Sequence, residues 1–269
     1  MKWCRYTAND STSYGIIEGD TVHEVSGDPI RQAQGEHART GATHSLGAVQ
    51  LEVPVIPPTF YAAGINYPEH VTWAAHMRGQ EPDLPKKADV GYRANNALVP
   101  HGHDIVVPAD ATEQLQYEGE LVVVIGKECG PTSTGPVSET NALDYVFGYT
   151  IGNDVSERTW QRGDRTMWRA KNTDTFKPMG PWIVTGLNPD DLHVIIRVND
   201  RVVGEYDVAT ALFGVRHYIS EMSKYLTLVP GDVLWMGTEG ATENMVDGDL
   251  CEIEISDIGT LSNRVNWLK

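Results

Sequence analysis

The sequence has little cysteine and no long apolar run. Its three cysteines, Cys4, Cys129 and Cys251, are far apart and form no Cys-x-x-Cys pair. This pattern argues against both a disulfide framework and a cysteine zinc site, and it favours a reducing compartment. The first residues lack the apolar stretch of a signal peptide, and runs such as 121–125 are too short to span a bilayer. We therefore expect a cytoplasmic protein with no membrane partner.

Basic residues are also scarce. The chain of 269 residues has 37 acidic and 21 basic side chains, a formal charge of -16. Such a surface repels phosphate backbones, so a nucleic-acid partner is not expected. A Walker A loop, a Gly-x-Ser-x-Gly elbow and a Rossmann glycine fingerprint are absent as well. An acidic protein that acts on an anionic substrate needs a local positive centre, which a divalent cation with a few Lys or Arg residues would supply.

The distribution of turn-forming residues suggests two parts. Short β-like pieces at 14–17 and 21–25 lie between Gly and Asp turn signals. Three prolines within 53–58 then interrupt any regular element. We predict a small N-terminal β-rich domain, residues 1–52, and a main domain, residues 53–269.

Short Val, Ile and Leu runs dominate the main domain, whereas helical patterns are few. Helix formers occupy 70–79, and apolar residues recur at three- and four-residue spacing in 209–226. The polar segment 79–99 is expected to form a flap over a site. The pattern predicts a mainly β fold with a few helices, of the α+β class. The predicted strands lie at 105–107, 121–125, 145–151, 182–185, 194–198, 233–236 and 250–255.

Two acids stand two residues apart at the head of an apolar run, Tyr117-Glu118-Gly119-Glu120-Leu121. In a strand, residues i and i+2 face the same side, so both carboxylates would enter one space, where a cation would offset their repulsion. A solvated strand edge is the plainer interpretation of a bare Glu-x-Glu.

Two further stretches contain candidate polar groups. In Gly152-Asn153-Asp154, a β-like run ends where Asp154 could supply a third oxygen ligand, although such residues more often cap turns. Three carboxylates with water suit Mg²⁺, Mn²⁺ or Ca²⁺ better than zinc. Lys171 could stabilise an oxyanion beside that cation, although an isolated lysine is usually a solvated surface charge.

Taken together, these stretches resemble the fumarylacetoacetate hydrolase family. The resemblance extends to Gly64-Ile-Asn-Tyr67-Pro-Glu-His70, to Pro230-Gly-Asp through Gly237-Thr238, and to the segment from Gly248 to Val265. It covers residues 58–265. It implies a β-rich sandwich roll, a homodimer and a small anionic 2-oxo acid as substrate.

The resemblance also implies roles for individual residues. Mg²⁺ or Mn²⁺, with Ca²⁺ as an alternative, would be held by Glu118, Glu120 and Asp154. The catalytic residues would be His70, as general base, and Lys171. The expected substrate contacts are Tyr67, Arg158, Gln161 and Thr238.

Several positions depart from the family pattern. Hydrolytic members pair the lid histidine with a glutamate three residues later, but that position is Trp73 here, so His70 lacks a carboxylate that would raise its basicity. Glu239 follows Thr238 where a proline is usual, and Arg93 replaces a flap lysine. His101 and His103 are interpreted as exposed turn residues rather than metal ligands.

The family resemblance leaves three functions open. The leading hypothesis is metal-dependent hydrolysis of a C–C bond in an acylpyruvate-like 2-oxo or 1,3-dicarbonyl acid, in aromatic-compound catabolism. The alternatives are decarboxylation of a β-keto acid such as oxaloacetate, or keto–enol isomerisation, both of which need no attacking water and are favoured by Trp73. A catalytically inactive metal-binding module is the third.

Overall fold

The computed structural model describes residues 1–32, 37–77 and 79–269. In these residues the β-strands are β1 (Lys2–Ala8), β2 (Ser11–Glu18), β3 (Thr21–Val25), β4 (Arg39–Ser45), β5 (Gln50–Leu51), β6 (Phe60–Ala63), β7 (Val90–Tyr92), β8 (Leu98–Val99), β9 (Ile105–Val107), β10 (Leu115–Gln116), β11 (Gly119–Ile125), β12 (Val146–Asn153), β13 (Ser156–Glu157), β14 (Lys177–Val184), β15 (His193–Val198), β16 (Arg201–Asp207), β17 (Val233–Trp235), β18 (Leu250–Ile255) and β19 (Gly259–Trp267). The α-helices are α1 (Pro68–Met77), α2 (Arg158–Gly163), α3 (Trp168–Asn172) and α4 (Val215–Met222). Short 3₁₀ turns occur at Leu46–Ala48, Asn95–Ala97, Glu139–Tyr145, Pro189–Asp191 and Val208–Thr210.

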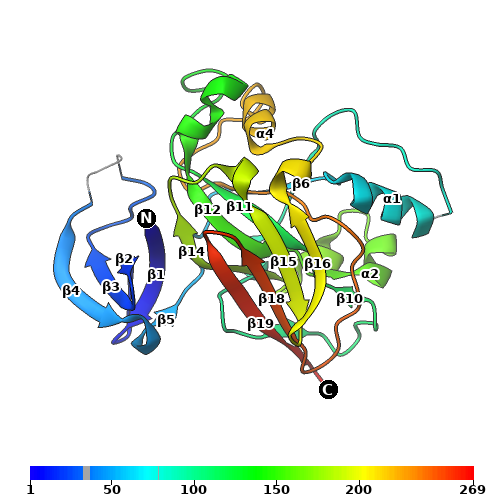
Figure 1. Cartoon of the computed structure of the whole chain (residues 1–269), viewed down its shortest axis with the longest axis horizontal. Helices are drawn as coiled ribbons and strands as arrows, with labels where there is room; N and C mark the ends of the chain where they lie inside the picture. Colours follow the sequence, from blue (N-terminus) through cyan, green and yellow to red (C-terminus); the bar gives the residue numbers. More distant parts are fainter. Residues whose placement is uncertain (33–36, 78) are drawn as a thin grey trace.

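One large mixed sheet runs through the molecule in the order β4-β3-β2-β1-β14-β12-β11-β17-β6-β7. Strand β1 joins its N-terminal strands to the rest, because Lys2 and Trp3 pair antiparallel with Val184 and Ile183 of β14. In Figure 1 these first strands, in blue, lie to the left of the main body. The N-terminal strands thus extend the sheet of the main body, and the division at residue 52 remains a prediction.

A second sheet, in the order β16-β15-β18-β19-β9, packs against the centre of the first. Leu121 and Ile151 from the large sheet share a buried apolar cluster with Ile196 and Ile253 from the second. Burial of this apolar surface, at roughly 25 cal/mol per Å², holds the two layers together. Figure 1 shows β15, β16, β18 and β19 side by side across the front of β11 and β12. This arrangement is the predicted mainly β, α+β architecture.

The structure confirms the predicted strands in outline and corrects two helical predictions. Helix α1 begins two residues before the predicted start, and position 78 of the predicted 70–79 lies outside the described residues. The predicted helix 209–226 is a 3₁₀ turn followed by the shorter α4, because Gly214 separates the two in an extended conformation. The proposed flap 79–99 contains β7 and β8 near its end. The longer strands β1, β4, β16 and β19 are among those that were not predicted.

Helices α1 and α2 lie together on one side of the body, near the ends of β10 and β16 in Figure 1. Residues of both helices line one cavity together with the acidic residues singled out above. No helix in the described part of the chain has both the length and the apolar character needed to cross a bilayer.

Candidate metal and substrate site

The residue between the two glutamates explains how both face one cavity. Gly119 opens β11, and a Cβ atom placed on it would come within 2.9 Å of Ile196 on the second sheet. A larger residue would have to displace this side chain, so this side of the strand packs closely against the core. Because alternate residues of a strand face opposite sides, Glu118 and Glu120 both face the other way, into a cavity.

Asp154 reaches the same place by strand pairing. Strands β11 and β12 are antiparallel, with Gly119 opposite Asn153, and the amide of Asp154 donates to the carbonyl of Glu118 at 2.8 Å. Asp154 therefore lies directly across from Glu118. One ligand oxygen from each of the three buried carboxylates lies within 4.8 Å of the others.

This donor set fits a divalent cation. A hard cation binds carboxylate oxygens at 2.0–2.6 Å, so ligands around it lie up to about 4 to 5 Å apart. The carboxylate of Glu120 accepts a hydrogen bond from the amide of Gly237 at 2.8 Å, and in the described residues it has no ion pair. Gly237 takes a positive φ of 85°, which favours glycine and directs its amide at this carboxylate. A cation held by Glu118, Glu120 and Asp154 would offset the charge of Glu120.

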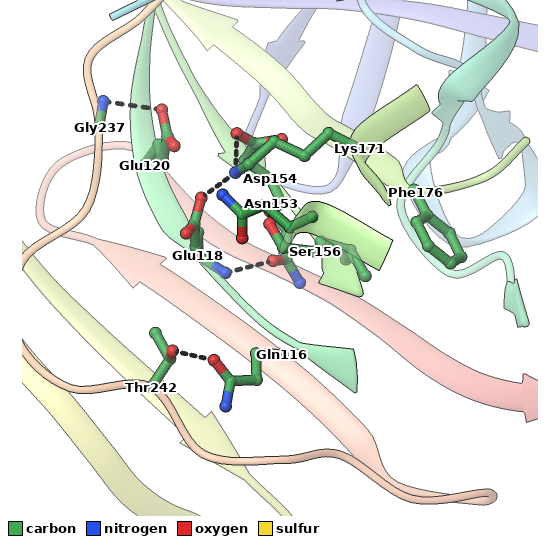
Figure 2. Close-up of polar contacts among 12 residues, drawn as sticks. Gln116, Glu118, Glu120, Asn153, Asp154, Ser156, Lys171, Phe176, Gly237 and Thr242 are labelled. Atoms are coloured by element: carbon green, nitrogen blue, oxygen red, sulfur yellow. Dashed lines mark hydrogen bonds and ion pairs between the residues drawn. The ribbon is translucent and has the colours of Figure 1, made fainter. Parts of the chain in front are cut away.

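Four basic side chains surround the acids. Nζ of Lys171, on α3, lies 2.5 Å from Glu118 and 2.7 Å from Asp154. Figure 2 shows the Lys171 side chain between these two carboxylates. Arg93 and Lys177 also contact Asp154, at 2.8 and 2.7 Å.

The fourth, Arg158, begins α2 and donates to Glu118 at 2.6 Å. It also binds Gln116, Gln161 and Thr242, at 2.7, 2.9 and 3.2 Å. With four bases against three acids, a divalent cation would leave the site with an excess of positive charge. Such a site attracts an anionic ligand.

Burial and neighbouring charges set different pKa values for the acids. Burial raises the pKa of Glu118, but Lys171 and Arg158 outweigh it and lower that pKa to about 2. Burial, Asp154 and Glu118 together raise the pKa of Glu120 to about 8. Burial also raises the pKa of Asp154, but the positive charges of Arg93, Lys171 and Lys177 outweigh it. They hold the pKa of Asp154 well below its usual range.

A cavity of about 780 Å³ lies over this centre. Its charged end contains the three acids with Arg93, Arg158 and Lys171, and its apolar wall contains Ile65, Trp73, Ala74 and Met167. Sites for small organic molecules have this size and this mixture of apolar surface with a few polar groups.

His70 projects into the cavity from the first turn of α1 and is mostly buried. Its Nδ1 lies 2.9 Å from the carbonyl oxygen of Gly240. Because a carbonyl only accepts, Nδ1 carries the proton, and Nε2 of the neutral ring holds a free lone pair. Burial lowers the pKa of His70, although the negative charge of Glu118 opposes the shift. The ring is therefore neutral near pH 7, as a general base requires.

The structure brings together most of the residues that the sequence indicated. His70, Glu118, Glu120, Asp154, Arg158, Gln161, Lys171 and Thr238 all line the cavity. Tyr67 does not: its ring is fully buried and packs edge-on against Tyr206 at 5.0 Å, so a substrate contact by Tyr67 stays a prediction.

Other residues of the site had not been recognised. Lys177 is fully buried, and burial lowers its pKa to about 7 although Asp154 opposes the shift. A lysine within an apolar run was the only available signal. Gln116 and Thr242 support Arg158 from segments distant in sequence, for which no local signal exists. His101 and His103 lie in a turn, as predicted, but His101 is partly buried rather than exposed, and its Nδ1 accepts from the amide of Ser262 at 3.1 Å.

Fold and site together define an α+β protein with a buried carboxylate centre at one end of a substrate-sized cavity. The family model described as fumarylacetoacetate hydrolase, C-terminal, matches residues 59–266, and an Rv2993c-like N-terminal model matches residues 1–54. The chain belongs to the fumarylacetoacetate hydrolase family.

Characterised relatives carry different activities. The chain is 33% identical over 286 residues to a 2,4-didehydro-3-deoxy-L-rhamnonate hydrolase from Sphingomonas, covering 99% of this chain and 96% of the relative. It is 34% identical over 234 residues to the oxaloacetate tautomerase YisK from Bacillus subtilis, covering 82% and 75%.

Solved structures are similar along their whole length. A 5-carboxymethyl-2-hydroxymuconate delta-isomerase from Mycobacterium smegmatis has a TM-score of 0.87 at 34% identity, with 100% of both chains covered. A maleylpyruvate hydrolase from Sphingobium, in complex with manganese(II) and pyruvate, has a TM-score of 0.79 at 25% identity, again with 100% of both chains covered. The relatives are thus enzymes that act on small organic acids.

Proposed function

We propose that this protein is a divalent-metal-dependent hydrolase that cleaves the C–C bond of an acylpyruvate-like 2-oxo acid. The observation that carries the proposal is the cavity of about 780 Å³, which joins the charged carboxylate centre to an apolar wall. A pyruvate group suits the charged end, and the remaining volume and apolar surface suit an acyl group. The manganese and pyruvate in the maleylpyruvate hydrolase structure support this assignment.

Glu118, Glu120 and Asp154 would hold Mg²⁺ or Mn²⁺. When bound, that cation supplies Lewis-acid polarisation of the 2-oxo and carboxylate oxygens of the substrate. Lys171 holds a positive charge 2.5 and 2.7 Å from two of the three acids, so it stabilises negative charge that develops on the substrate oxygen.

His70 provides the base. Nε2 takes a proton from water, and the hydroxide oxygen bonds to the acyl carbon. The bond between that carbon and C3 of the pyruvate part then breaks, its electron pair forms the pyruvate enolate, and a proton is added at C3. The products are a carboxylic acid and pyruvate. Gly240 keeps the ring in the required tautomer, which is part of what a carboxylate partner otherwise does.

A second function is favoured by one observation. Trp73 lies against His70, with ring centroids 5.2 Å apart, in the place where a carboxylate would strengthen the base. Keto–enol isomerisation or decarboxylation needs proton transfer at carbon but no activated water, and the relatives include a tautomerase and an isomerase.

The test is an assay of the Mn²⁺-loaded protein with benzoylpyruvate, acetylpyruvate and oxaloacetate. Pyruvate is measured with lactate dehydrogenase, CO₂ by trapping, and enolisation by ultraviolet absorbance. Release of equimolar acid and pyruvate, lost in Glu118→Gln, is the expected result. Enolisation or CO₂ release without acid assigns the second function.

The Trp73→Glu variant further distinguishes hydrolysis from enolisation. Its carboxylate would stand beside His70, so it should raise hydrolysis relative to enolisation, while Trp73→Phe keeps the wild-type ratio. If Lys171→Ala changes no activity on any substrate, the third alternative, an inactive metal-binding module, gains support.

We further propose a homodimer, which sedimentation velocity would test.

A further inference from the structure

In the described part of the chain, one basic side chain that lines the cavity, Arg162, forms no ion pair with the acids of the carboxylate centre. Arg93, Arg158, Arg162 and Lys171 line the cavity. Arg93 pairs with Asp154, and Arg158 and Lys171 pair with Glu118. Among the residues that the structure describes, Arg162 alone of these four has no carboxylate partner. Its side chain is exposed, which places it at the rim.

Arg162 nevertheless has a defined position. Its Nη2 donates to the side-chain oxygen of Gln114 at 2.8 Å, and Gln114 also lines the cavity. A neutral amide orients the guanidinium without neutralising it. The remaining N–H donors of Arg162 are free to bind an oxyanion, for which the planar fork is well suited.

Two segments, α2 and residues 114–118, set the distance between Arg162 and the carboxylate centre. On α2, Arg158 and Arg162 are four residues apart and therefore lie on one face, about 6 Å apart along the axis. Along the neighbouring segment, alternate residues Gln114, Gln116 and Glu118 all line the cavity, and four extended residues span about 13 Å. Arg158 binds Gln116 and Glu118, whereas Arg162 binds Gln114. The two cations thus follow the same row of side chains from centre to rim.

We propose that Arg162 forms an anion subsite at the rim and selects 2-oxo acids with a second carboxylate, roughly 6 to 13 Å from the 2-oxo end. This inference rests on the proposed function, because it assumes that the 2-oxo end occupies the carboxylate centre. In a chain with a net charge of -16, an unneutralised arginine at the cavity mouth also draws a dianion toward the site.

The experiment measures binding rather than turnover. Calorimetric titrations of the Mn²⁺-loaded protein compare 2-oxo dicarboxylates of seven to ten carbons with 2-oxo monocarboxylates of equal length. Wild type should bind the longer dicarboxylates more tightly than their monocarboxylate counterparts. Arg162→Gln should reduce this preference by roughly three- to tenfold, as for the loss of one charge-assisted hydrogen bond. Arg162→Lys should keep part of it, because charge remains but the fork is lost.

Arg165→Gln is the matched control. Arg165 is exposed three residues later and is not among the residues that line the cavity. A general effect of surface charge would weaken dicarboxylate binding equally in both variants, and that result would overturn the subsite. Equal binding of mono- and dicarboxylates by wild type would also overturn it.

The outcomes separate the two proposals. Cleavage of acylpyruvates without a dicarboxylate preference removes the subsite and leaves the hydrolase. A preference that depends on Arg162, without cleavage of any acylpyruvate, keeps the subsite and removes the hydrolase. If no 2-oxo acid binds in the presence of Mn²⁺, both proposals fail.

Discussion

Nδ1 of His70 lies 2.9 Å from the carbonyl oxygen of Gly240, which connects the helix that carries the proposed base to the loop that follows β17. The neighbouring residue of that loop, Glu239, makes two more contacts. Its carboxylate accepts from the amide of Glu69 on α1 at 3.3 Å and from the hydroxyl of Thr210 at 2.6 Å. Residues 239 and 240 therefore position both the start of α1 and its histidine.

Glu239 should therefore stabilise α1 locally. The amide of Glu69 is one of the first-turn donors that a helix cannot satisfy internally. We expect Glu239→Ala to lower the free energy of local opening of α1 by about 1 kcal/mol and to increase hydrogen exchange in 68–77. Glu239→Gln, which keeps an acceptor, should retain most of the protection. Glu243→Ala, which removes an exposed ion pair with Arg201, is the control. Equal exchange in Glu239→Ala and wild type would contradict the positioning role.

The pH dependence of kcat/KM should reflect His70. Burial lowers its pKa, so the ring stays neutral at pH values where a free histidine is already half protonated. Activity should fall only as the pH drops through this lowered pKa, below 6.5, because protonation removes the lone pair on Nε2. His70→Asn should lose activity by roughly 10²- to 10⁴-fold. Mn²⁺ binding should persist in this variant, as measured by calorimetry. An unchanged acid limb in a residually active His70→Asn would assign that limb to another group.

Two of the three acids, Glu120 and Asp154, should respond differently to neutralisation in the metal-free protein. Glu120→Gln replaces a buried carboxyl group that has no ion pair in the described residues and whose pKa is raised to about 8, so thermal stability near pH 7 should stay close to that of wild type. Asp154→Asn leaves Arg93 and Lys177 without their carboxylate, and loss of one partner of a buried pair costs about 3 to 5 kcal/mol. Calorimetric unfolding after removal of cations with a chelator measures both. A loss of stability in Glu120→Gln as large as that in Asp154→Asn would refute this distinction.

Added Mn²⁺ should make wild type clearly more stable than Glu120→Gln. Binding to the native state alone stabilises by about 2.7 kcal/mol at a hundredfold excess over Kd. Wild type should therefore unfold several degrees higher with the cation, whereas Glu120→Gln should gain much less. Glu243→Gln, which alters an exposed acid, should gain as much as wild type. The same gain in all three proteins would place the cation elsewhere.

Local patterns in the sequence predicted much of the fold and the centre of the site. The alternation of apolar residues gave most of the central strands, since burial of one face requires it. Glu118 and Glu120 could be placed on one face of a strand for the same reason. Arg162 was not indicated, because its partner Gln114 lies 48 positions away and a rim arginine resembles any other exposed one.

The sequence by itself determined the class of protein, through the order and spacing of Glu118, Glu120, Asp154 and Lys171. Only the tertiary structure decided which basic side chains pair with these acids and neutralise their charge. The pairing of β11 with β12 sets Asp154 opposite Glu118, and Arg93, Lys177 and Arg158 reach the acids from distant segments. The tertiary structure also gives His70 a hydrogen-bond partner that the sequence did not indicate, the carbonyl of Gly240, 170 residues away. Charges and hydrogen bonds act through space, so a local pattern cannot specify which distant groups will meet.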